Sequence, residues 1–215
     1  MPCKVIMDLR PVGAFNLSKN ESSATLPCEF MGRSFSADNI ANIQVVVSKK
    51  AAAGRSVSTL VKELEETIAN GGILRVVGQL EQVAYQDRGD GKEHDYLRLF
   101  AYHVEASDEV APDFSMATIT GNVGKMTARE ESLSASFTIS SRPSPGFNRL
   151  SFLNIFVSVF GCVVQKVQTK KIRNKRYVTA VGKLAATNTG RLSMTLHDID
   201  YAKFPKPAKQ RVAKK

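Results

Sequence analysis

The stretch YVTAVGKLAA (Tyr177–Ala186) decides the fold, because its centre, AVGKL (Ala180–Leu184), has a counterpart, VVGQL (Val76–Leu80), in the first half of the chain. Both pentapeptides lie in the fourth strand-like segment of their half, and similar segments surround each of them. We interpret the pair as an internal repeat of one structural module. The 215 residues of the chain are enough for two domains of about 100 residues each.

The second half shows five strand-like segments separated by turns. In LSASFTIS (Leu133–Ser140) apolar residues alternate strictly with serine and threonine, which is the period of a strand with one buried face. The other segments span residues 117–126, 150–161, 177–186 and 191–202. Five short strands with turns between them favour a small barrel.

The first half has the same order of strands, with a helix between the third and the fourth. Strands are expected at residues 3–9, around Cys28, and at 42–50, 73–86 and 95–106. In the helical segment SVSTLVKELEETIANGG the apolar residues share one face, Ser56 or Ser58 can cap the start, and Gly71 with Gly72 ends the helix. This order of strands and helix is that of an OB-fold barrel.

We therefore predict a mainly β chain that contains two five-stranded OB-fold barrels in tandem, the first with an inter-strand helix. The first module spans residues 1–110 and the second spans residues 114–204, joined by the acidic, proline-containing segment Ser107–Ser115. In the second module the helix is short or degenerate, and the basic run Gln165–Arg176 replaces it. Residues 205–215 are expected to form a basic, disordered tail.

The charge of the chain is divided unequally between its halves. The net charge is +10 and the sequence pI is about 9.6. Residues 1–112 carry 12 Lys and Arg against 15 Asp and Glu, whereas residues 113–215 carry 18 against 5. A strongly basic half indicates a polyanionic partner, with nucleic acid ahead of an anionic membrane. A basic surface kept for solubility is the alternative.

The basic run between the third and fourth strands of the second half is the strongest charge feature. It holds six cations and no acidic residue, and these are Lys166, Lys170, Lys171, Arg173, Lys175 and Arg176. Lys and Arg bind backbone phosphates with counterion release, so we expect this run to contact nucleic acid from a mobile loop. Arg142 and Arg149, which flank the turn before the third strand, extend the same track. A solvated charged loop remains the alternative.

The third strand of the second half has aromatic residues on the face that should be polar. Leu153, Ile155, Val157 and Val159 form one face, which fits a core. The opposite face carries Phe152, Phe156 and Phe160, and aromatic rings of this kind stack on the bases of single strands. Contact with a partner subunit and burial in the core are the alternatives for each phenylalanine.

Two further strands present candidate binding residues. On the fourth strand of the second half, Val178, Ala180 and Leu184 should point inward, while Tyr177, Thr179 and Lys183 point outward. On the fifth strand of the first half, one face carries a possible secondary stacking set, made up of Tyr96, Arg98, Phe100 and Tyr102. That half is net acidic, so we expect it to serve assembly more than binding.

The sequence shows no catalytic constellation. His94, His103 and His197 are scattered, and neither a nucleophile elbow nor a phosphate-binding loop occurs. Asp198 and Asp200 share a strand face and could hold Mg²⁺, but two carboxylates alone are weak support for a metal site. We therefore predict a non-enzymatic protein without cofactor or metal.

The cysteines and the hydropathy favour the cytoplasm. Cys3, Cys28 and Cys162 are odd in number and far apart, so neither a disulfide framework nor a zinc site is indicated. A reducing compartment fits free thiols. No apolar run approaches the roughly 20 residues of a membrane helix, and the N-terminus lacks the apolar core of a secretory signal.

Several segments resemble bacterial-type single-stranded DNA-binding proteins. The resemblance rests on the segments MATITGNVGKMTARE, SLSASFTIS and LSFLNIFVSVFG in the second half and GGILRVVGQLEQVAYQDRGDGKEHDY in the first. The resemblance implies an OB-fold, binding of single strands without sequence preference, and assemblies of four modules, hence a homodimer here. Phe160 and Phe152 stand where the family has aromatic residues on the third strand, and Tyr177 begins the fourth strand.

The chain also departs from that family. It has no tryptophan, although the family often stacks bases on this residue, and its C-terminus is basic where the bacterial proteins end in an acidic tail that recruits partners. These differences put tail-mediated recruitment of replication enzymes in doubt and would suit a phage, plasmid or other mobile-element protein, acting in the host cytoplasm or nucleoid.

The leading hypothesis is a single-stranded DNA-binding protein that protects and organises single strands during replication or recombination. Replication or recombination proteins are then possible partners. The alternatives are a single-stranded RNA-binding protein and an assembly protein, such as a nucleocapsid or primosome scaffold, whose OB modules pair mainly with protein.

Overall fold

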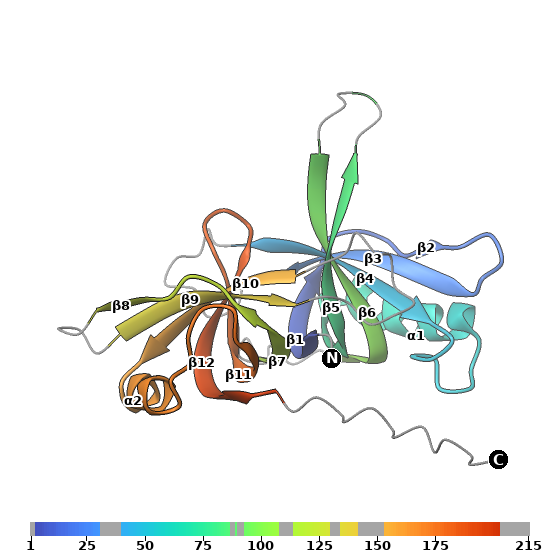
Figure 1. Cartoon of the computed structure of the whole chain (residues 1–215). Helices are drawn as coiled ribbons and strands as arrows, with labels where there is room; N and C mark the ends of the chain where they lie inside the picture. The colour runs from blue at the N-terminus through green and yellow to red at the C-terminus, as the bar shows by residue number, and fades with distance from the viewer. Residues whose placement is uncertain are drawn as a thin grey trace, which may run out of the picture.

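The computed structural model describes residues 3–30, 40–86, 89, 93–107, 114–129, 134–141 and 153–202. The mainly β composition predicted from the sequence is confirmed, and Figure 1 shows two β units side by side. The strands of the first unit are β1 (Cys3–Pro11), β2 (Asn16–Leu17), β3 (Ser23–Phe30), β4 (Ala41–Ser48), β5 (Ile73–Gln86) and β6 (Glu93–Ser107). Those of the second unit are β7 (Ser115–Val123), β8 (Thr127–Arg129), β9 (Ser134–Ser141), β10 (Leu153–Phe160), β11 (Tyr177–Ala186) and β12 (Leu192–Tyr201).

Strand pairing closes a ring in each unit. In the first unit β1 pairs with β5, β5 with β6, β6 with β4, β4 with β3, and β3 again with β1. In the second unit the corresponding strands β7, β11, β12, β10 and β9 pair in the same cyclic order. The parallel pair of each ring occupies the same place, β4 with β6 and β10 with β12. The repeat predicted from two pentapeptides therefore extends to the whole pattern of pairing.

The glycine shared by the two pentapeptides has the same structural role in both units. The register of β5 against β6 shifts between Val77 and Gly78, and that of β11 against β12 shifts between Val181 and Gly182. A Cβ atom at Gly78 would collide with the carbonyl oxygen of Phe100, and one at Gly182 with that of Thr195. Glycine is needed because a neighbouring backbone passes too close for a side chain.

The two units are joined edge to edge through β1 and β7. These strands run antiparallel, with Val5 opposite Ala117. Val5 pairs with Gly78 on β5, and Ala117 pairs with Gly182 on β11, so Val5 and Ala117 are equivalent residues of the two units. Because equivalent residues face each other, the units are related by a local two-fold axis through this pair. Pairing across it gives one sheet of 12 strands.

The junction is reinforced by side chains beside β1. Arg75 donates from Nε to Oδ1 of Asp8 over 2.8 Å, and Asp8 is buried. The backbone N–H of Asp8 donates to the carbonyl of Phe114, whose own N–H donates to Asp8 Oδ2. Phe114 therefore fixes the entry to β7 against the first unit. Residues 108–113 of the expected linker lie outside the described residues.

Each unit has a helix between its third and fourth ring strands. Helix α1 (Val57–Ala69) is capped by the Ser56 side chain, which accepts from the N–H of Thr59. Its apolar face buries Val57, Leu60, Val61 and Leu64, and Ile68 packs partly against the core. Helix α2 (Cys162–Thr169) buries Val164 and Val167. The basic run thus does not fully replace the second helix, because its first five residues belong to α2, where Val167 has a core to pack on. Neither helix is long and apolar enough to cross a membrane.

Candidate nucleic-acid interface

Strand β10 has the two faces that its alternation predicts. Leu153, Ile155, Val157 and Val159 are buried in the core of the second unit. On the opposite face the side chains of Phe156 and Phe160 are 47% and 57% exposed. Single exposed apolar side chains are common at protein surfaces, but two aromatic rings on one face of a strand are candidates for stacking on a ligand. Neither ring belongs to the core.

The neighbours of the two rings are small and polar. Phe156 lies between Thr138 on β9 and Ser193 on β12, and Phe160 lies opposite Ser134 on β9. Hydroxyl side chains of this size cannot cover an aromatic ring from the next strand. The rings therefore stand out from a polar sheet surface, and a flat partner such as a nucleobase can stack on them.

The predicted faces of β11 are also present. Val178, Ala180 and Leu184 are buried, whereas Tyr177 and Lys183 are half-buried on the outer side. Thr179 lies between them on that side and hydrogen-bonds the hydroxyl of Thr120 over 3.0 Å. This arrangement places one aromatic ring and one cation on the outer face of β11.

The loop after α2, residues 170–176, is held firmly to the second unit, in contrast to the mobile loop expected from its composition. Ile172 is buried. The N–H of Lys175 donates to the carbonyl of Val123, and the N–H of Val123 donates to the carbonyl of Arg176, each over 2.8 Å. The Tyr201 hydroxyl donates to the carbonyl of Lys170 over 2.7 Å. Sequence analysis missed these contacts because they come from segments distant in the chain.

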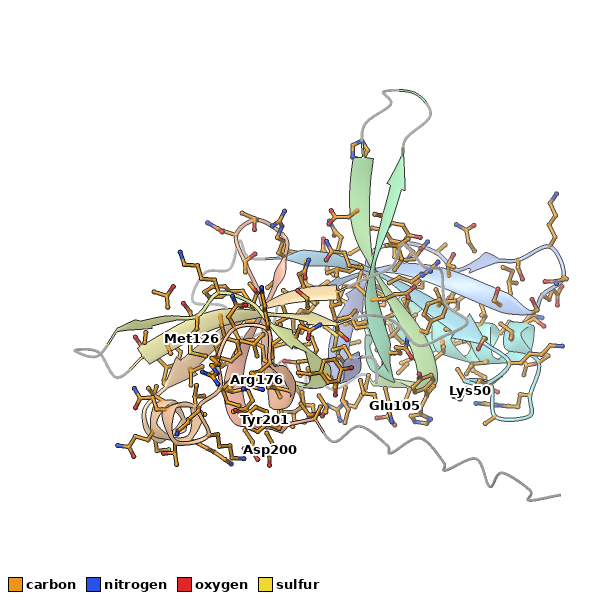
Figure 2. All side chains as sticks on the ribbon, viewed as in Figure 1. Lys50, Glu105, Met126, Arg176, Asp200 and Tyr201 are labelled. Carbon is orange, nitrogen blue, oxygen red and sulfur yellow. The ribbon has the colours of Figure 1, made fainter. Side chains whose placement is uncertain are left out.

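The anchored loop presents cations at its surface. Four of them are exposed, namely Lys171, Arg173, Lys175 and Arg176. In Figure 2, Arg176 lies on the second unit beside the segment of Tyr201, whereas Lys50 and Glu105 lie on the first unit. A fixed set of exposed cations can hold phosphates without first losing the conformational entropy of a free loop.

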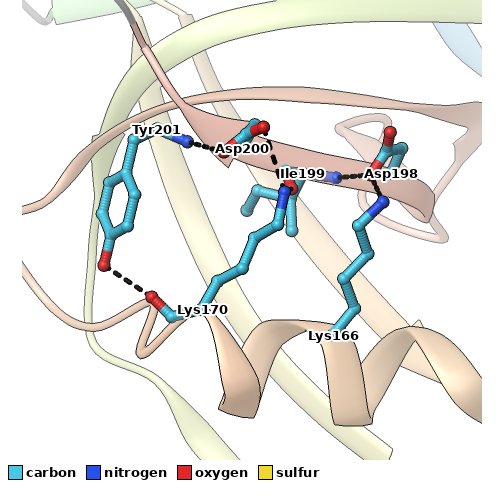
Figure 3. A network of polar contacts seen from close by, with 6 residues as sticks. All are labelled: Lys166, Lys170, Asp198, Ile199, Asp200 and Tyr201. Carbon is cyan, nitrogen blue, oxygen red and sulfur yellow. Dashed lines mark hydrogen bonds and ion pairs between the residues drawn. The ribbon is translucent and has the colours of Figure 1, made fainter.

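Two cations of the basic run are already paired, which the sequence did not indicate. Lys166 on α2 donates to Asp198 on β12, and Lys170 Nζ lies 3.0 Å from Asp200 Oδ2 and donates to the carbonyl of Ile199 (Figure 3). The hydrogen bond from Lys166 lowers the pKa of Asp198, and that from Lys170 lowers the pKa of Asp200. These carboxylates offset two of the six charges, and they are bound to lysines. Across the described residues no cluster of three or more His, Cys, Asp or Glu could hold a metal ion.

Three predicted site residues, Phe152, Arg142 and Arg149, lie outside the described residues, as does the predicted tail at 205–215. Their part in binding remains a prediction.

The secondary stacking set of the first unit bonds to its own sheet. Arg98 donates from Nε to Oε1 of Glu81 over 2.7 Å, and the Tyr102 hydroxyl donates to Oε1 of Gln79 over 2.9 Å. Glu81 and Gln79 are each only 2% exposed. Arg98 also lies over the ring of Phe100, and Lys50 over that of Tyr102. These side chains contact one another, and binding of nucleic acid through this set stays a prediction.

The ring registers show what the first unit has in place of the exposed phenylalanines. Gln44 on β4 lies opposite Arg98, and Phe156 on β10 lies opposite Ser193 at the equivalent place. Counting along the strands, Gln44 corresponds to Phe156, Asn42 to Asn154 and Ser48 to Phe160. The first unit therefore has amides and a hydroxyl at these positions.

Two cavities adjoin these amides, and sequence analysis missed them. One, of about 550 Å³, is lined mainly by apolar residues with Asn42, Gln44 and Tyr96. The other, of about 600 Å³, lies between the units and shares Asn42 and Tyr96 with the first. Its wall in the second unit includes Asn154 and Arg191. Only the strand pairing brings these residues together, so no local pattern could have indicated them.

Comparison with solved structures bears on the fold. No protein-family model and no curated protein matches the chain. The wild-type single-stranded DNA binding protein from Thermus aquaticus superposes with a TM-score of 0.57 at 14% sequence identity, covering 96% of this chain and 94% of that one. A deletion mutant of the same protein gives 0.57 at 13% identity and covers 96% and 97%.

The chain shares its fold with that protein. The match spans both units of this chain. A mitochondrial single-stranded DNA binding protein from S. cerevisiae is 24% identical and covers 42% of this chain and 96% of its own, but its TM-score of 0.34 is too low to support an argument.

Proposed function

We propose that the protein binds single-stranded DNA without sequence specificity and acts by holding strands, not by catalysis. The observation that carries the proposal is the pair of exposed rings, Phe156 and Phe160, on a polar sheet face of the same basic unit as the anchored loop with four exposed cations. Rings stack on bases of any sequence, and cations hold the phosphates between them. The shared fold with a single-stranded DNA binding protein supports the same function.

The finer parts of the proposal follow from this function. Each closed ring of five strands is an OB-fold module. The binding surface formed by Phe156, Phe160 and the loop after α2 is extended by Phe152, Tyr177, Lys183, Arg142 and Arg149. A homodimer would bring four modules together, which sedimentation at several protein concentrations tests. Protection of single strands in replication or recombination, in the cytoplasm, is the role that such binding serves.

Fluorescence anisotropy tests the function directly. Labelled single-stranded DNA, the matched duplex and single-stranded RNA of the same sequence are titrated with the protein across a salt series. We expect the tightest binding to single-stranded DNA, with affinity falling steeply as salt rises. Preference for RNA would favour the alternative RNA-binding function, and no binding at low salt would favour an assembly protein.

Replacing the two phenylalanines tests whether bases stack on β10. Each of Phe156→Ala and Phe160→Ala should weaken binding of single-stranded DNA by about 5- to 150-fold, since stacking on one ring contributes about 1–3 kcal/mol. The matched control is Ser48→Ala, at the position of the first unit that corresponds to Phe160, and it should bind as the unchanged protein does. Equal affinity of all three variants would contradict stacking on β10.

A further inference from the structure

The two adjoining cavities form one groove that leads from β10 into the first unit. Asn42, Tyr96 and Leu97 line both cavities, so the two adjoin at these residues, and we treat them as one groove. The units also touch at its edge, because a Cβ atom added at Gly190 would lie 3.5 Å from the carbonyl oxygen of Ile40. Each volume, about 550 and 600 Å³, is in the range of small-molecule sites, and hence large enough for a nucleotide.

The groove begins beside the exposed rings. Asn154 lines the cavity between the units, and it lies two residues before Phe156 on the same face of β10. Two residues along a strand span about 7 Å. The nucleotides next to a base stacked on Phe156 are therefore within reach of the groove.

The side chains of the groove suit a nucleobase and a phosphate. Asn42 and Gln44 present amides, which donate and accept at once and therefore match the edges of bases. Asn154 accepts from the Ser140 hydroxyl through its oxygen over 2.6 Å, so its amide nitrogen is left to donate. Asp95, on the wall formed by the first unit, accepts from Gln82 and disfavours a phosphate there. Arg191 is exposed and, among the described residues, forms no ion pair with a carboxylate.

We propose that this groove between the units is a second single-strand site, in which Asn42 and Gln44 hydrogen-bond the edges of bases and Arg191 binds a phosphate. The proposal rests on the proposed function, and it gives the first unit a binding role that does not use exposed aromatic rings. The bound segment belongs to the same DNA strand that stacks on Phe156 and Phe160. A peptide of a partner protein is the competing occupant.

The test uses the full chain and a labelled 30-nucleotide oligothymidylate, long enough to exceed the roughly 4–16 nucleotides that one OB-fold covers. The double variant Asn42→Ala with Gln44→Ala should weaken binding about 10-fold. Arg191→Ala should also weaken it and make the slope of log K against log salt shallower by about 0.7. The control Lys62→Ala, an exposed cation on α1, should leave both affinity and slope unchanged.

A second double variant distinguishes loss of a direct contact from loss of folding. Asn42→Asp with Gln44→Glu keeps the side-chain shapes and adds two anions beside the strand, so it should weaken binding more than the alanine pair does. Thermal unfolding of every variant is followed by circular dichroism, and we expect melting temperatures close to that of the unchanged protein because these side chains are not in the core. A direct contact should appear as a photocrosslink between 5-iodouracil in the oligonucleotide and Tyr96.

The outcomes separate the two proposals. If the unchanged protein does not bind single strands, the proposed function itself fails. If Phe156→Ala with Phe160→Ala binds normally, stacking on β10 fails. If the phenylalanine variants lose affinity while both groove variants and Arg191→Ala stay within about two-fold of the unchanged protein, the groove is not a strand site and only the second proposal is overturned. A protein segment then becomes the better occupant.

Discussion

The two units of this chain share one frame and differ at its surface. Both rings have the same cyclic pairing, the same parallel pair and a register shift at the same glycine. Yet the face that carries Phe156 in the second unit carries Gln44 in the first. The difference shows that ring formation constrains the inward residues, while outward residues are free to change. The second unit therefore has exposed phenylalanine side chains and cations on its surface, whereas the first has amides that line the groove between the units.

The largest expected effect comes from removing the four exposed cations of the loop after α2 in the second unit. Replacing Lys171, Arg173, Lys175 and Arg176 by alanine should make the slope of log K against log salt shallower by up to about 3, at about 0.7 for each phosphate that is no longer neutralised. The measurement is anisotropy with single-stranded DNA between low and moderate salt. Four exposed lysines elsewhere, Lys4, Lys19, Lys49 and Lys62, form the matched control. An equal change in both sets would mean that total charge matters and the loop does not.

The shared frame can be tested at the two glycines. Gly78→Ala and Gly182→Ala should each lower the free energy of unfolding by about 1–3 kcal/mol, because the added methyl group meets a backbone carbonyl that cannot move away cheaply. Chemical denaturation measures both. The control is Lys183→Ala, beside Gly182 on β11, with an expected change within about 0.5 kcal/mol. If only one of the two glycine variants lost stability, the register shifts at Gly78 and Gly182 would not be structurally equivalent.

Asp198 and Asp200 on β12 neutralise two lysines of the basic run, Lys166 and Lys170. Asp198→Asn with Asp200→Asn frees Lys166 and Lys170, so binding of single-stranded DNA should tighten and its salt slope steepen by up to about 1.4. The matched control is Glu63→Gln with Glu66→Gln on α1, which should change neither. Unchanged binding in the aspartate variant would show that these lysines lie away from the strand.

The same pairs predict a small effect of pH on stability. Both aspartates have pKa values lowered by their lysine partners, so the folded state binds protons less readily than the unfolded state. Their contribution is therefore complete above the unfolded pKa, near 3.8, and is lost as the pH falls through the lower folded pKa. Melting curves of the double Asn variant and the unchanged protein should differ at neutral pH and converge in acid.

The smallest expected effect concerns the thiols. Burial raises the pKa of Cys3 and of Cys28 to about 12, whereas Cys162 is exposed at the start of α2. Since the thiolate is the reactive form, a thiol reagent should label one cysteine of the folded protein rapidly and the other two only on unfolding. Cys162→Ser should abolish the fast reaction. Rapid labelling of two thiols would show that one unit opens readily.

Local patterns predicted the elements well. The alternation in β10 gave its buried and exposed faces, and the spacing of Val57, Leu60, Val61 and Leu64 gave α1 with its serine cap. The candidate rings Phe156 and Phe160 followed from the same alternation. These succeed because each pattern depends on residues that are neighbours in one strand or helix.

Contacts between distant segments were beyond such patterns. Composition suggested a mobile loop over the whole basic run 165–176, but residues 165–169 belong to α2, and the rest is pinned by Ile172 and by Val123 of β7. It also counted Lys166 and Lys170 as available charges, although Asp198 and Asp200 pair with them across the unit. The period of a strand says which side a residue faces and does not say which residue of another strand lies opposite it.

The sequence by itself determined which residues face the core, that the module occurs twice, and that positive charge gathers in the second half. These are local or additive properties, so periodicity and counting suffice to find them. Only the tertiary structure decided that β3 and β9 close their rings, which cations of the basic run pair with aspartates, and that Asn42, Asn154 and Arg191 meet in one groove. Those features depend on the register between strands far apart in the chain, which packing of the whole molecule selects.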